Sequence, residues 1–82
     1  MIVKQLRVYH PWDEHILKDI YREWVDGGYL NMVGYDRQSK TYEVAFNYVE
    51  NWRGFSRLFY DNVKSSDAKL YRQAWPHNPF NR

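Results

Sequence analysis

Alternation of apolar and polar residues at the start of the chain predicts a β-strand over residues 2–9. One face of this strand is apolar, and the other carries Val3, Gln5, Arg7 and Tyr9. Between residues 12 and 26 the apolar spacing changes to three and four, which predicts an amphipathic helix. Pro11 suits the first turn of that helix, and the Gly27-Gly28 pair ends it.

The middle of the chain predicts a β-hairpin, with strands at 29–35 and 41–49 joined by a loop over 36–40. Its second strand has the clearest alternation in the sequence. We expect the residues of one parity to lie in the core, namely Tyr42, Val44, Phe46 and Tyr48.

A second helix is predicted over residues 50–64, where Trp52, Phe55, Phe59 and Val63 form an apolar stripe. Residues 68–75 allow two interpretations. Their composition favours a third helix, whereas their alternation would permit a fourth strand and the ferredoxin-like order βαββαβ. We therefore predict an α+β fold of order β-α-β-β-α followed by a third helix. In this fold two helices pack on a small antiparallel sheet.

Composition limits the chain to one domain, which we place at residues 1–75, with an extended tail at 76–82. The chain has 82 residues, a net charge of +2 and no cysteine. The lack of cysteine excludes a disulfide scaffold, a thiolate metal site and a cysteine nucleophile. The chain is rich in aromatic residues, with four Trp, eight Tyr and four Phe, and these are its main source of burial energy.

The sequence shows no pattern of residues typical of catalysis. The three histidines lack metal-ligand spacing, because His10 and His15 do not stack on one helical face. No serine lies in a nucleophile elbow, and no glycine cluster forms a phosphate loop. We therefore expect no enzyme activity, no metal and no cofactor. No family resemblance extends across the chain.

The surplus of Tyr, Trp and Arg favours a protein-binding role, because these residues dominate interface hot spots. We expect a non-enzymatic protein that occupies a surface of a larger protein partner, as accessory or inhibitor proteins of phages and mobile elements do. Four candidate contact residues are expected on the sheet face opposite the core, and two lie near the C-terminus. They are Arg7, Tyr9, Tyr29, Tyr35, Trp75 and Phe80. For Trp75 and Phe80 a core position is an equal alternative.

The alternative function is nucleic-acid binding by the C-terminal half, where basic residues outnumber acidic ones. The candidate residues are Arg53, Arg57, Tyr60, Lys64, Lys69 and Arg72. The exposed hairpin edge also leaves a homodimer possible.

The expected location is the cytoplasm, or the host cytoplasm if the chain is phage-encoded. No apolar run is long enough to cross a membrane, and residues 1–7 lack the apolar region of a signal peptide. We therefore expect no membrane contact.

Overall fold

The computed structural model describes residues 2–75, and it has the predicted order β-α-β-β-α-α. The segment with two interpretations, residues 68–75, is helical as far as Ala74, so the four-stranded ferredoxin-like alternative is wrong. The expected tail at 76–82, which includes Phe80, lies outside the described residues. The elements are β1 (Ile2–Arg7), α1 (Pro11–Asp26), β2 (Leu30–Asp36), β3 (Thr41–Phe46), α2 (Val49–Asn62) and α3 (Ser65–Ala74).

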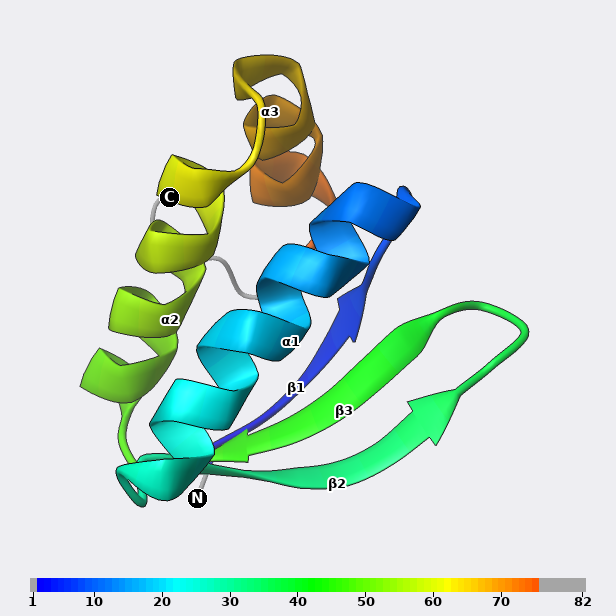
Figure 1. The fold of residues 1–82 in the computed structure, drawn as a ribbon. Helices are drawn as coiled ribbons and strands as arrows, with labels where there is room; N and C mark the ends of the chain where they lie inside the picture. Colours follow the sequence, from blue (N-terminus) through cyan, green and yellow to red (C-terminus); the bar gives the residue numbers. More distant parts are fainter. Residues whose placement is uncertain (1, 76–82) are drawn as a thin grey trace.

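The strands of the described residues form one antiparallel sheet in the order β1-β3-β2. Helices α1 and α2 lie side by side over one face of this sheet (Figure 1). The register places Leu6 opposite Tyr42 and Leu30 opposite Phe46, so the apolar residues of all three strands face the helices. The opposite face carries no element of residues 2–75.

Aromatic rings hold the two covering helices on the sheet. The Phe55 ring of α2 packs edge-on against Trp24 of α1 and also contacts Phe46 of β3. Gly54 allows this close approach, because a Cβ there would lie 3.1 Å from the Trp24 ring. Tyr48 was expected in the core but is exposed. It follows the end of β3 and is the N-cap of α2, so strand alternation no longer applies to it.

A β-bulge in β2 changes which face its last residues occupy. Met32 pairs with Val44 and Gly34 with Glu43, so Val33 is the extra residue. The bulge places Tyr35 opposite Tyr42, on the face that the helices cover. The expectation that Tyr35 lies on the opposite face is therefore wrong, because simple alternation does not hold across an inserted residue.

Helix α3 and its C-cap residue close the end of the core through buried residues spaced three and four apart, namely Ala68, Tyr71 and the C-cap Trp75. The Trp75 ring stacks on Phe59 of α2 at a centroid distance of 4.6 Å. The Trp75 indole N–H donates to the backbone carbonyl of Arg7 at 3.0 Å. This periodic burial explains why the segment is a helix and not a strand.

Candidate functional site

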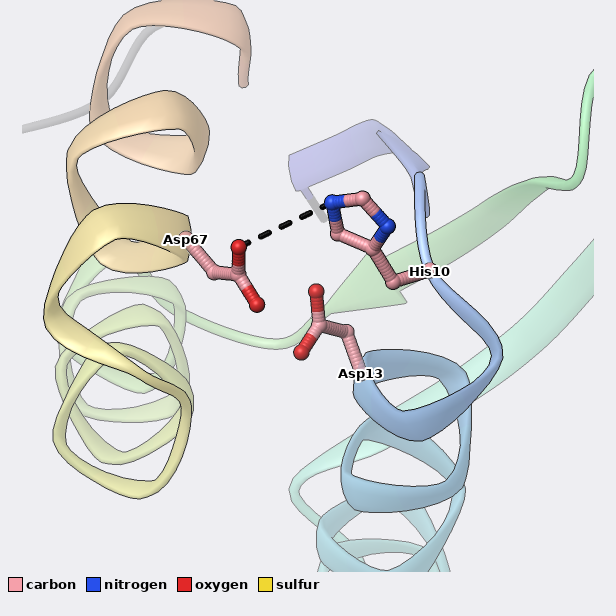
Figure 2. A group of neighbouring side chains, drawn as sticks. All are labelled: His10, Asp13 and Asp67. Carbon is pink, nitrogen blue, oxygen red and sulfur yellow. Dashed lines mark ion pairs between the residues drawn. The ribbon is translucent and has the colours of Figure 1, made fainter.

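The fold brings together His10, Asp13 and Asp67 (Figure 2). His10 directly precedes α1, Asp13 lies in the first turn of α1, and Asp67 lies in the first turn of α3. One ligand-type atom from each residue lies within 4.8 Å of the other two. His10 Nε2 lies 3.6 Å from Asp67 Oδ1, and this is the ion pair drawn in Figure 2.

Local sequence explains why these carboxylates lie where they do. Pro11 is the first residue of α1. Proline suits this position because it has no backbone N–H, and the N–H of a first helical residue has no partner within the helix. Asp13 and Asp67 each occupy the third position of a helix, where the helix dipole favours negative charge. The packing of α3 against α2 then sets the two helix starts facing each other across the cluster.

Asp13 is fully buried, although it is a charged residue. Its Oδ2 accepts a hydrogen bond from the Tyr71 hydroxyl at 2.9 Å, whereas its Oδ1 has no hydrogen-bond partner. Burial raises the pKa of the Asp13 carboxyl above its ordinary value of 3.8; the Tyr71 hydroxyl lowers this pKa, and nearby Asp67 raises it. A buried carboxylate oxygen without a partner is costly, so this atom requires a proton or a cation.

Tyr71 connects the cluster to the rest of the fold. Its hydroxyl accepts a hydrogen bond from the Tyr9 backbone N–H at 2.9 Å while it donates to Asp13. The strand exit after β1 is thereby fixed to α3. Burial, together with the bond to Asp13, raises the pKa of Tyr71, so the hydroxyl keeps its proton.

The cluster opens to solvent on one side. An open pocket of about 590 Å³ is lined by His10, Trp12, Lys64, Ser66 and Asp67. Although Lys64 lines this pocket, no Lys or Arg among residues 2–75 forms an ion pair with Asp13 or Asp67. Within the described chain the nitrogen-bearing side chain that pairs with this carboxylate cluster is therefore the His10 imidazole.

A second candidate surface is the sheet face opposite the helices. Its paired positions form three rows across β1, β3 and β2: Val3–Ala45–Asn31, Gln5–Glu43–Gly34 and Arg7–Thr41–Asp36. We call this surface the open face. Gly34 has no side chain and Thr41 has a small one, which leaves a shallow hollow of about 350 Å³ that the acidic residues Asp36 and Glu43 help to line.

The predicted partner-binding residues do not form one surface. Arg7 lies on the open face with its guanidinium 4.9 Å from the centre of the Tyr9 ring, and Tyr9 itself packs on Tyr71. Tyr29 was expected on the open face, but its ring packs against Trp24 of α1. Tyr35 lies on the helix side, where its hydroxyl donates to Glu14.

Trp75 was offered either as a contact residue or as part of the core, and the structure places it in the core, only 2% exposed. It packs on Phe59, Tyr71, Tyr60 and Trp52. No face of the ring remains available for a large partner. Phe80, the other C-terminal candidate, lies outside the described residues.

The predicted nucleic-acid-binding residues divide between α2 and α3. Arg53, Arg57, Lys64, Lys69 and Arg72 are exposed, as expected. Tyr60 was expected beside them on the polar side of α2, but its side chain is buried and stacks under the Arg72 guanidinium at 5.4 Å. Arg57 and Arg72 share a small pocket with Tyr60 and Asp61.

Sequence reasoning missed the His10–Asp13–Asp67 cluster. The sequence allows His10 to lie near Asp13, three residues along the chain, but the structure also pairs His10 with Asp67, a carboxylate from a distant helix. His15 instead pairs with Asp19 one turn along α1, at 3.5 Å. No local pattern could have found the cluster, because it depends on how α3 packs.

Comparison of the chain with protein-family models, with curated proteins and with solved structures gave no match. Within the described part of the chain, every helix is too short or too polar to cross a membrane. The site must therefore be interpreted from its own chemistry.

Proposed function

We propose that this protein is a non-enzymatic binding protein, and that its open face contacts a larger protein partner. The observation that carries the proposal is a three-stranded sheet on which the helices of residues 2–75 cover one face and leave the other open. Antiparallel sheets commonly pack one face on the core and leave the other face polar and solvated. Here Val3 on β1 and the bulge residue Val33 on β2 add apolar side chains that are each more than half exposed.

Charge indicates the kind of partner. Glu43 and Asp36 line the hollow, and neither carboxylate forms an ion pair with a Lys or Arg of residues 2–75. The Gln5 side chain donates to Glu43 at 3.3 Å, which orients that carboxylate. We therefore propose a partner that inserts a Lys or Arg side chain into the hollow and packs apolar groups on the two valines.

Both edge strands of the sheet disfavour the addition of a partner strand, which supports contact with the partner through the open face instead. On β1, Lys4 points inward to the core face, and on β2 the bulge at Val33 interrupts the regular ladder. Inward charges and bulges are features that prevent edge-to-edge pairing of strands. A partner strand added to either edge would meet one of these features.

The test is capture of a partner from lysate of the natural host by matched charge-reversal variants. Glu43→Lys reverses a charge in the hollow, and Glu23→Lys reverses an exposed charge on α1 as the control. We expect one protein to be captured by the wild type and by the control after nuclease treatment, and to be lost with Glu43→Lys. Equal capture by both variants would contradict the open face as the binding surface.

A second candidate function is nucleic-acid binding. It is supported by the exposed basic side chains of α2 and α3, of which Arg57 and Arg72 line one small pocket. This candidate predicts binding to a DNA or RNA oligonucleotide of arbitrary sequence. A plot of log affinity against log salt concentration should fall with a slope of about one unit per phosphate contact. Arg57→Glu should abolish that binding, whereas Glu43→Lys should not weaken it. Absence of binding at low salt would remove this candidate.

A further inference from the structure

We propose that His10, Asp13 and Asp67 bind a divalent transition-metal ion of the Zn²⁺ type. The site lies apart from the open face, and the proposal does not depend on the proposed function. Two independent observations lead to it. One is the convergence of three ligand-type atoms, and the other is a fully buried Asp13 oxygen that no hydrogen bond satisfies.

The geometry suits a small ion. Zn²⁺ binds imidazole nitrogen and carboxylate oxygen at about 2.0–2.2 Å, so two ligands of a tetrahedral ion are roughly 3.4 Å apart. His10 Nε2 and Asp67 Oδ1 are 3.6 Å apart, and the atom contributed by Asp13 lies within 4.8 Å of both. Only small side-chain rotations are needed to bring all three to bonding distance.

The donor set indicates the class of ion. An imidazole with two carboxylates favours Zn²⁺ and its neighbours in the first transition row, whereas Mg²⁺ and Ca²⁺ prefer oxygen donors alone. The chain has no cysteine to provide a soft ligand. Two carboxylates and one divalent ion form a neutral site, which removes the cost of the uncompensated carboxylate of Asp13.

The groups around His10, Asp13 and Asp67 also favour the binding of a metal ion. Tyr71 donates to Oδ2 of Asp13, which holds this carboxylate in place and leaves Oδ1 without a hydrogen bond. Such a hydrogen bond is the usual second-shell support for a metal ligand. His10 and Asp67 line the open pocket, so an ion can enter and water can complete its coordination.

A bound ion would join two parts of the fold that otherwise meet only through side chains. His10 and Asp13 belong to the start of α1, and Asp67 to the start of α3. The ion would thus fix α3 in place, and metal binding would be observed as thermal stability. An ion at about 100 times its Kd should raise the thermal midpoint of a domain of this size by roughly 10–20 °C.

The experiment uses the untagged full chain, freed of metal with a chelator and titrated with Zn²⁺, Co²⁺ and Mg²⁺. We expect one Zn²⁺ per chain by calorimetry, an increase in thermal midpoint, a visible d–d spectrum with Co²⁺ and no response to Mg²⁺. His10→Gln and Asp67→Asn should each weaken Zn²⁺ binding about 10-fold or more. Both positions are at least partly exposed, so we expect these variants to fold.

The matched control is the double variant His15→Gln/Asp19→Asn. It removes the same residue types from an exposed pair on α1 that has no third ligand. Zn²⁺ binding should be unchanged in this variant. Absence of stoichiometric Zn²⁺ binding would overturn the proposal and would mean that a proton shared by Asp13 and Asp67 satisfies the buried oxygen. Equal Zn²⁺ affinity in the wild type, His10→Gln and Asp67→Asn would overturn it as well.

Discussion

At the scale of single residues, one carboxylate links the hairpin to the first helix. Glu14 of α1 accepts hydrogen bonds from the hydroxyls of Tyr42 at 2.6 Å and of Tyr35 at 3.2 Å. The two rings lie 4.5 Å apart by centroid distance. The Tyr42 bond is the main cause that lowers the pKa of Glu14 below its ordinary value of 4.5.

Tyr42→Phe should therefore destabilise the protein in a pH-dependent way. Because the folded-state pKa of Glu14 is lowered, ionised Glu14 stabilises the fold above pH 4.5, and this stabilisation is lost as the pH falls through the lowered pKa. Removing the Tyr42 hydroxyl should cost about 1–2 kcal/mol at neutral pH, and the difference from wild type should shrink in acid.

Denaturant unfolding at pH 7 and at about pH 3 measures this difference. Tyr35→Phe is the control, because the longer bond and the exposed ring of Tyr35 predict a smaller loss at pH 7. A deficit of Tyr42→Phe that is equally large at both pH values would show that the hydroxyl acts by packing and not through the charge of Glu14.

At the scale of the elements, α3 depends on one tryptophan. Trp75→Ala should destabilise the protein by about 3–5 kcal/mol, because it empties a buried site and removes the hydrogen bond to the Arg7 carbonyl. Trp12→Ala is a matched control at an exposed position and should change stability by about 0.5 kcal/mol or less. Thermal and denaturant unfolding give both values. Comparable losses in the two variants would contradict the assignment of Trp75 to the core.

The elements could be predicted from the sequence where periodicity was regular. The alternation of β3 and the apolar stripe of α2 each identified an element and its core face, as Phe46 and Phe55 show. The position of Tyr35 was not predicted, because it depends on the residue inserted at Val33. Gly34, a glycine within the strand, is the sequence feature that points to a bulge at this place. The Asp13–Asp67 contact could not be predicted either, since it depends on how two helix starts pack.

At the scale of the whole molecule, the sheet edges predict a monomer. Lys4 lies buried on the core face of edge strand β1, with its ammonium 5.5 Å from the centre of the Trp52 ring, and burial lowers its pKa. Lys4→Val removes this inward charge and should promote self-association. Sedimentation velocity should give a monomer for the wild type and a larger species for Lys4→Val. A wild-type dimer would instead support the homodimer that the exposed hairpin edge left possible.

The central claim, contact through the open face, is tested most directly by carboxyl footprinting of the captured complex. Carbodiimide labelling read by mass spectrometry reports the accessibility of each Asp and Glu with and without the partner. The account predicts reduced labelling of Glu43 and Asp36, with Glu23 and Asp61 unchanged. Unchanged labelling of Glu43 and Asp36, with protection at Glu23 or Asp61, would place the partner on the helices and contradict the account.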